Sequence, residues 1–441
     1  MLGQKRVNER NHLEIGSCDV VDLAEQFGTP LYVFDEDEIR SAVREYKEAF
    51  SASYPRFHVA YAGKAFLCAA MCSLVAEEGL WLDVVSGGEY FVARESGFPE
   101  DRVIFHGNNK TDAERSLAFQ GGVGRWVVDS FEELECLLEE GKRYARGRIP
   151  VLFRITPGID PHTHAYIATG KIDSKFGFPI SDGIAEKAIT LALSSPYLDV
   201  RGIHCHIGSQ IRTLEPFLKA VDVLLDFMAS LREKHGVVLD ELDLGGGLGV
   251  PYLDEEKGSF PSIHSYVTAL CEKVREKCAS LSYPLPLLFV EPGRSIVNTA
   301  GSTLYRVGFI KEIPGVKKYV AVDGGMVDNP RPVLYGARYQ AIVGNRVEGT
   351  PKERVAIAGK CCESGDVLIP EIELPRIQRG DILVIEGTGA YNYSMASNYN
   401  LIPRPGVVFV RKGVARLVVR PESLSDLLRR DLVPCGEGEK R

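Results

Sequence analysis

Between about residue 57 and residue 298, short apolar runs alternate with longer segments whose apolar residues recur at spacings of three and four. The runs are typical of buried strands and the longer segments of amphipathic helices. We predict eight strands, within residues 57–64, 81–86, 103–107, 125–130, 151–158, 200–209, 241–247 and 286–294. Eight strand–helix units predict a (β/α)8 TIM barrel. A doubly wound sheet is the alternative.

Polar residues fall at the carboxyl ends of these predicted strands, where barrel enzymes keep their chemistry. They are Lys64, Asp83, His106, Asp129, Arg154, His206 and Glu291. A closed barrel explains this polar rim more easily than an open sheet does. Thr111-x-x-Glu114 and Ser130-x-x-Glu133 have the spacing of capping boxes, which predicts a helix start at each.

After residue 300 the chain changes to short runs rich in β-branched and aromatic residues, separated by turn residues. This pattern predicts a second, all-β domain. The segment TPLYVFD, which ends at residue 35, is predicted to add a strand to it. The expected division is therefore a barrel over residues 36–298 and a β-rich domain made of residues 1–35 and 299–441.

Composition limits the function classes. The formal charge of −8 argues against general nucleic-acid binding. No apolar stretch approaches the roughly 18 residues of a membrane helix, and the hydrophilic N-terminus does not resemble a signal peptide. The ten cysteines are scattered and form no paired CxxC elements. A reduced, cytoplasmic setting is expected.

Three segments carry candidate chemistry. Lys64 follows the small residues Ala60 and Ala62, and partial desolvation is expected to depress the pKa of its amine. The glycines at 245–249 let backbone amides converge on an anion, while Val250-Pro-Tyr is unlike the helix start of a dinucleotide fingerprint. Together with the Glu291-Pro-Gly-Arg294 segment they are typical of a pyridoxal phosphate site. Each segment alone also has a purely structural explanation, as an ion pair or a packing turn.

Other residues leave alternatives open. His204 and His206 share one face of a predicted strand, as ligands of metal-dependent barrel hydrolases do. The cationic Lys64 and Arg154 nearby argue against a metal, so no metal site is predicted. Cys361 and Cys362 are adjacent, so at most one of them faces a given site. Tyr391 lies in a glycine-rich loop that is typical of a binding loop.

The chain closely resembles the diaminopimelate decarboxylase family, pyridoxal 5′-phosphate enzymes of the alanine-racemase-like fold class. The resemblance extends from TPLYVFDEDEIR to GVVFVRKG, nearly the whole chain. The motifs that carry it are YAGKAF (61–66), DVVSGGE (83–89), HGNNK (106–110), HCHIGSQ (204–210), DLGGGLGVPY (243–252), EPGRSIV (291–297), VDGGMVDNPRPVLYGA (322–337), CESGD (362–366) and GAYNYSMASNYN (389–400).

The resemblance implies residue roles. Lys64 would attach the cofactor covalently, and Asp83 would also bind the cofactor. His206 would stack on the ring and Glu291 would hold the ring nitrogen. The phosphate would be surrounded by Ser209, Gly245, Gly246, Gly247, Gly293, Arg294 and Tyr391. The substrate would contact Arg294, Arg331, Tyr335, Glu363 and Tyr391. Cys362, from the partner subunit of a homodimer, would supply the proton after carbon dioxide leaves.

The activity that the resemblance implies is decarboxylation of meso-2,6-diaminopimelate to L-lysine, the last step of lysine biosynthesis. Glu363 and the ATGKIDSKFGF segment (168–178) favour this substrate. Two alternatives are an ornithine, lysine or arginine decarboxylase on the same scaffold and a catalytically silent regulatory homologue. Arg331 and Tyr335 argue against the first, because those substrates lack a distal carboxylate. Retention of Lys64 and Cys362 argues against the second.

Overall fold

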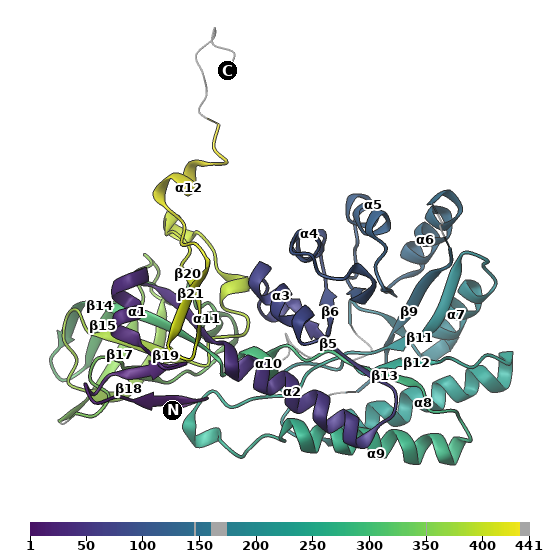
Figure 1. The fold of residues 1–441 in the computed structure, drawn as a ribbon, viewed down its shortest axis with the longest axis horizontal. Coiled ribbons are helices and arrows are strands. Elements are labelled where there is room, and N and C mark those ends of the chain that lie inside the picture. Colours follow the sequence, from purple (N-terminus) through teal and green to yellow (C-terminus); the bar gives the residue numbers. More distant parts are fainter. Residues whose placement is uncertain (145–146, 160–173, 350, 433–441) are drawn as a thin grey trace, which may run out of the picture. The chain divides into compact units, whose positions relative to one another are not determined.

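The computed structural model describes residues 1–144, 147–159, 174–349 and 351–432. The chain divides into two compact units (Figure 1). Unit 1 comprises residues 1–3, 36–300 and 389–394, and unit 2 comprises residues 4–35, 301–388 and 395–441. Among the described residues, no helix has the length and apolar character needed to cross a membrane.

Unit 1 contains a closed barrel of parallel strands, as the alternating pattern predicts. The strands are β5 (Phe57–Ala62), β6 (Trp81–Val84), β7 (Val103–Phe105), β8 (Arg125–Val128), β9 (Ile149–Thr156), β11 (Leu198–His204), β12 (Glu241–Asp243) and β13 (Leu287–Val290). They pair in this order, β8 with β9 and β13 with β5, so the ring has no open edge. This closure confirms the barrel and excludes the doubly wound sheet. The short strand β10 (Phe178–Pro179) pairs with β9.

Helices follow the barrel strands and cover their outer face (Figure 1). They are α3 (Ala69–Glu77), α4 (Gly87–Glu95), α5 (Asp112–Gly121), α6 (Phe131–Tyr144), α7 (Ile184–Leu193), α8 (Glu215–His235), α9 (Ile263–Leu281) and the short α10 (Arg294–Val297), while α2 (Glu36–Ser53) precedes β5. Inside, side chains from several strands form an apolar cluster of Ala60, Trp81, Ile104, Val127, Leu152 and Phe289. A packed interior leaves only the strand ends for chemistry.

The two predicted capping boxes behave differently. Thr111 and Glu114 form a complete box at the start of α5, in which each side chain bonds the other residue's backbone amide. At the start of α6, Ser130 Oγ accepts from the Glu133 amide over 3.2 Å, as predicted. The Glu133 carboxylate instead accepts from the Asp129 amide over 2.8 Å, so the second box is only half formed.

Unit 2 is built mainly from β-strands. A large sheet has the strand order β18 (Val367–Pro375), β17 (Lys352–Ala358), β15 (Lys317–Val322), β14 (Gly301–Ile313), β4 (Leu31–Asp35), β20 (Gly406–Arg411), β21 (Val414–Val419), and β19 (Ile382–Glu386) joins β14 to β16 (Ala341–Val343). The predicted N-terminal strand is β4, which pairs with β14 and β20 and is buried at all five residues.

The remaining elements of unit 2 are shorter. A small sheet contains β1 (Lys5–Val7), β2 (Leu13–Ile15) and β3 (Cys18–Asp19), and the helices are α1 (Val20–Phe27), α11 (Arg331–Tyr335) and α12 (Leu424–Leu428). Strand β18 was not expected from the sequence. Its prolines argue against a central strand, and β18 lies at the sheet edge, where proline is tolerated.

A buried ion pair connects the loop that follows β7 to helix α6. The Lys110 side chain is only 1% exposed and lies 2.7 Å from Glu133 Oε1. Its ammonium also donates to the carbonyls of Gly107 and Val127, over 3.0 and 2.8 Å. Breaking such a pair is costly because the remaining partner is left buried without compensation.

We therefore expect Lys110→Met to lower the free energy of unfolding of unit 1 by about 3–5 kcal/mol. Urea unfolding followed by tryptophan fluorescence would measure this, since both tryptophans, Trp81 and Trp126, lie in barrel strands. Lys142→Met is the matched control, because Lys142 and its partner Glu139 are 52% and 61% exposed. Equal unfolding midpoints for the two variants would contradict the prediction.

Candidate active site

A small cavity opens at the carboxyl ends of the barrel strands, and its walls come from separate β–α units. Lys64 lies in a 3-10 turn, Gly63–Ala65, directly after β5. Glu291 directly follows β13, and Arg294 is the first residue of α10. The lining residues are Ala62, Lys64, His206, Ser209, Gly247, Leu248, Glu291, Gly293, Arg294, Ser295 and Tyr391. The cavity therefore brings together most residues of unit 1 that the sequence singled out.

Lys64 is held by a buried carboxylate. Its Nζ lies 2.8 Å from Asp83 Oδ2, and Asp83 on β6 has no exposed surface. Burial opposes the charged amine, but Asp83, followed by Tyr391 and Glu291, outweighs burial and raises the pKa of Lys64 above its ordinary value. The expected depression of this pKa is wrong, because Asp83 comes from the adjacent strand. Of the two small residues expected beside the amine, Ala62 lines the cavity, whereas Ala60 packs in the apolar cluster.

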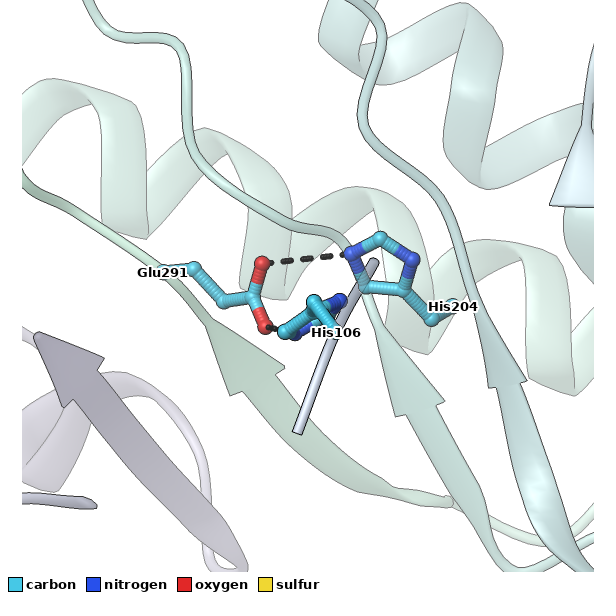
Figure 2. A group of neighbouring side chains, drawn as sticks. All are labelled: His106, His204 and Glu291. Atoms are coloured by element: carbon cyan, nitrogen blue, oxygen red, sulfur yellow. Dashed lines mark hydrogen bonds and ion pairs between the residues drawn. The ribbon is translucent and has the colours of Figure 1, made fainter. Parts of the chain in front are cut away.

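Glu291 is buried between two histidines (Figure 2). His106 Nε2 lies 2.6 Å from Glu291 Oε1, and His204 Nε2 lies 3.2 Å from Oε2. Burial opposes the carboxylate, but His106 and His204 outweigh it and hold the pKa of Glu291 well below its ordinary value. Burial lowers the pKa of His204 to about 3, so this imidazole is neutral at physiological pH.

Asp243, the last residue of β12, is a second buried carboxyl group next to Glu291. Its Oδ1 accepts from the Gly245 amide over 2.8 Å. Burial, and then the charge of Glu291, raise the pKa of Asp243 well above its ordinary value. The two pKa shifts run in opposite directions, which favours the charge on Glu291 and the proton on Asp243.

The glycine segment after β12 lies too close to neighbouring backbone to carry side chains. Gly245 and Gly247 have φ values of +63° and +126°. A Cβ on Gly247 would approach the Gly208 carbonyl oxygen to 2.5 Å, closer than real Cβ contacts allow. Both positions therefore require glycine.

Arg294 lines the same cavity as Gly247. Its guanidinium donates to Ser209 Oγ over 3.0 Å and to the Tyr252 hydroxyl, and it lies 4.8 Å from the centre of the Tyr391 ring. Its Nε is buried and has no hydrogen-bond partner among the described residues. A guanidinium beside backbone amides is suited to a phosphate or a carboxylate.

His206 lines the same cavity, and its Nδ1 accepts from the Gly246 amide over 3.3 Å. Burial, followed by the positive charges of Lys64 and Arg154, lowers the pKa of His206 well below its ordinary value. A neutral, flat imidazole in this place is suited to contact an aromatic ring.

The donor set fits pyridoxal 5′-phosphate. An amine, a buried carboxylate and an arginine–glycine cradle correspond to its aldehyde, its ring nitrogen and its phosphate. His106, His204 and Glu291 also place three possible metal ligands within 4.8 Å of one another. Those atoms already satisfy one another as hydrogen-bond donors and acceptors, which explains their burial without a metal.

The remaining predicted residues lie in unit 2. The Arg331 guanidinium lies 5.0 Å from the ring centre of Tyr335, and both residues belong to α11. Cys361 is buried, and burial raises the pKa of its thiol to about 12. Cys362 is exposed, and its amide donates to Asn400 Oδ1 over 2.7 Å. The neighbouring Glu363 carboxylate turns back to its own loop, where it accepts from the Gly365 amide over 3.3 Å.

Sequence reasoning missed part of the site. His106 was only a rim residue and His204 only a metal candidate, yet both bond Glu291. Asp243 was not considered, although it ends a predicted strand as the other polar residues do. Residues 168–173 of the ATGKIDSKFGF segment lie outside the described residues.

Comparisons with known proteins agree with this geometry. Residues 36–298 match the family described as pyridoxal-dependent decarboxylase, pyridoxal binding domain. The chain is 48% identical to the diaminopimelate decarboxylase of Bacillus subtilis strain 168, over 100% of this chain and 99% of the relative. It is 44% identical to that of Staphylococcus aureus strain COL, over 97% of this chain and 99% of the relative.

Solved structures give the same result. The crystal structure of diaminopimelate decarboxylase from M. jannaschii in complex with L-lysine is 39% identical, with a TM-score of 0.92, and the match covers 98% of this chain and 99% of that one. The Helicobacter pylori diaminopimelate decarboxylase, also in complex with L-lysine, is 32% identical with a TM-score of 0.85, over 93% and 98% of the two chains.

The Lys64–Asp83 pair leads to a prediction for the chain without cofactor. Asp83→Asn removes the carboxylate but keeps the burial, so the pKa of Lys64 should fall and more amine should be uncharged at neutral pH. Reductive methylation, followed by peptide mass mapping, would then begin at lower pH in the variant than in the wild type. The exposed Lys142 serves as an internal reference in each sample. The same onset of Lys64 labelling in both proteins would show that Asp83 does not control this amine.

Proposed function

The chain belongs to the diaminopimelate decarboxylase family of pyridoxal-dependent decarboxylases, and from this premise we propose that it converts meso-2,6-diaminopimelate to L-lysine and carbon dioxide. The observation that carries the proposal is that Lys64, Glu291 and Arg294 line the same cavity. Glu291 is bonded there by two histidines. When bound, pyridoxal 5′-phosphate supplies the electron sink for the carbon that loses carbon dioxide.

The barrel, residues 36–298, would bind the cofactor. Lys64 would hold the aldehyde carbon of the cofactor, and Asp83 would accept a hydrogen bond from the Lys64 amine whenever that amine is free, as the 2.8 Å contact between them supports. Glu291 binds the ring nitrogen and His206 packs on the ring. Phosphate contacts come from Ser209, Gly245, Gly246, Gly247, Gly293, Arg294 and Tyr391.

The substrate would be aligned by its distal end. Arg294, Arg331 and Tyr335 bind the distal carboxylate, Glu363 lies near the distal amine, and Tyr391 completes the pocket. Such contacts use binding energy to orient the bond that breaks. Holding the substrate at a point remote from the reacting carbon also distinguishes it from shorter amino acids.

Cys362 would return a proton to the reacting carbon. Its exposure supports this role, whereas Cys361 is buried and its pKa is raised to about 12. We further propose that the chain works in the cytoplasm as a homodimer, with Cys362 contributed by the partner subunit. The cysteines of the described residues are all free of disulfide bonds, which supports a reducing compartment.

The attachment point can be tested directly. Borohydride treatment of the chain loaded with pyridoxal 5′-phosphate should fix the cofactor to the peptide that contains Lys64, because reduction makes the link to the amine permanent. Peptide mass mapping would locate the tag, and Lys64→Ala should carry none and release no carbon dioxide. A tag on another lysine would contradict the assignment.

Substrate choice depends on Arg331. The wild type should release carbon dioxide from meso-2,6-diaminopimelate far faster than from ornithine or lysine. Arg331→Met should lower kcat/KM for diaminopimelate by about 10- to 100-fold, the loss expected for a hydrogen bond to a charged group. Its effect on ornithine should be small, since ornithine has no distal carboxylate. Faster turnover of ornithine by the wild type would instead favour the ornithine-type decarboxylase.

A further inference from the structure

The Glu291 carboxylate accepts one hydrogen bond on each of its oxygens. His106 reaches Oε1 and His204 reaches Oε2, with the two rings next to one another (Figure 2). The two imidazole rings stand edge to face, with centroids 4.7 Å apart. Because each oxygen is bound to a different ring, the carboxylate cannot rotate about its last carbon–carbon bond without losing both hydrogen bonds. Each oxygen keeps a further lone pair for another donor.

Protons must lie on particular atoms in this arrangement. A separation of 2.6 Å between His106 Nε2 and Glu291 Oε1 requires a proton between them. Each oxygen of the Glu291 carboxylate faces a different Nε2, and an ionised carboxylate only accepts, so both histidines donate from Nε2 in the ionised state that the lowered pKa of Glu291 favours. This has a cost, since His204 Nδ1 is then a buried acceptor without a partner in the described part of the chain. Because this tautomer leaves Nδ1 of His204 without a partner among the described residues, we infer that the hydrogen bond from its Nε2 to Glu291 has a function.

We propose that His106 and His204 are positioning residues, which orient the Glu291 carboxylate and keep it ionised so that it binds the protonated ring nitrogen of the cofactor. The inference rests on the proposed function, because that function supplies the cofactor. A fixed anion at this place keeps the proton on the ring nitrogen, and a protonated ring accepts electrons better. Neither histidine needs to touch the cofactor or the substrate.

The test combines substitutions with a spectroscopic signal. We would load wild type, His106→Leu, His204→Leu, His106→Gln and His204→Gln with pyridoxal 5′-phosphate labelled with 15N in the ring, and record the chemical shift of that nitrogen. Leucine removes the donor, whereas glutamine retains an amide N–H. His58→Leu is the control, because His58 packs against Trp81 and Phe289 of the barrel and has no contact with Glu291 among the contacts described.

In the leucine variants the 15N shift should move toward that of unprotonated pyridine. Their kcat should fall by about 10- to 100-fold, the change expected when a charged group loses a hydrogen bond, with KM changed by less than about threefold. The glutamine variants and His58→Leu should keep the wild-type shift. An unchanged shift in the leucine variants, or glutamine variants as impaired as the leucine variants, would overturn the proposal.

A measurement on the wild type requires no substitution to fold. Long-range 1H–15N correlation spectra of the chain without cofactor should show His106 and His204 protonated on Nε2. A tautomer protonated only on Nδ1 in either ring would overturn the inference. This result is independent of the proposed function, whose own failure would appear as no cofactor uptake and no release of carbon dioxide.

Discussion

The negative charge of a buried carboxylate at the end of a barrel strand needs hydrogen-bond donors to stabilise it. Much of this site is arranged to meet that requirement. Glu291 has little exposed surface, and an isolated charge there would be unstable. Two histidines from other strand ends provide the compensation, and Asp243 accommodates the same charge by remaining protonated. Each partner comes from a separate β–α unit, so the compensation exists only once the barrel has closed.

Much of the fold could be predicted from the sequence, because the parallel strands of a barrel are buried on both faces and appear as continuous apolar runs. The closure of β8 onto β9 follows from eight such runs. The edge strand β18 could not be predicted in the same way, since a solvated edge tolerates prolines that would normally argue against a strand. The half-formed capping box at Ser130 was disturbed by a tertiary contact, the ion pair of Glu133 with Lys110.

The residues of the candidate site could be predicted from the sequence, but which of them contact one another could not. Strand ends indicated Lys64, Asp83, His106 and Glu291, yet no spacing along the chain states which of them are neighbours. The pKa of Lys64 shows the consequence. Burial alone would depress it, whereas Asp83 on the next strand raises it. For the adjacent cysteines, the sequence predicts only that at most one faces a given site. Both lie after the end of β17 and outside any strand, and Cys361 is buried whereas Cys362 is exposed.

The segment Gly389–Ser394 belongs to unit 1, although the chain on both sides of it belongs to unit 2. Within it, the Tyr391 amide and the Ser394 hydroxyl both donate to the Ala65 carbonyl, one residue beyond Lys64. Unit 1 therefore includes six residues that are distant in sequence from the rest of the unit. A recombination event that exchanged only the coding sequence of residues 36–300 would not include residues 389–394 of the same unit. We therefore expect the two units to evolve as one gene segment.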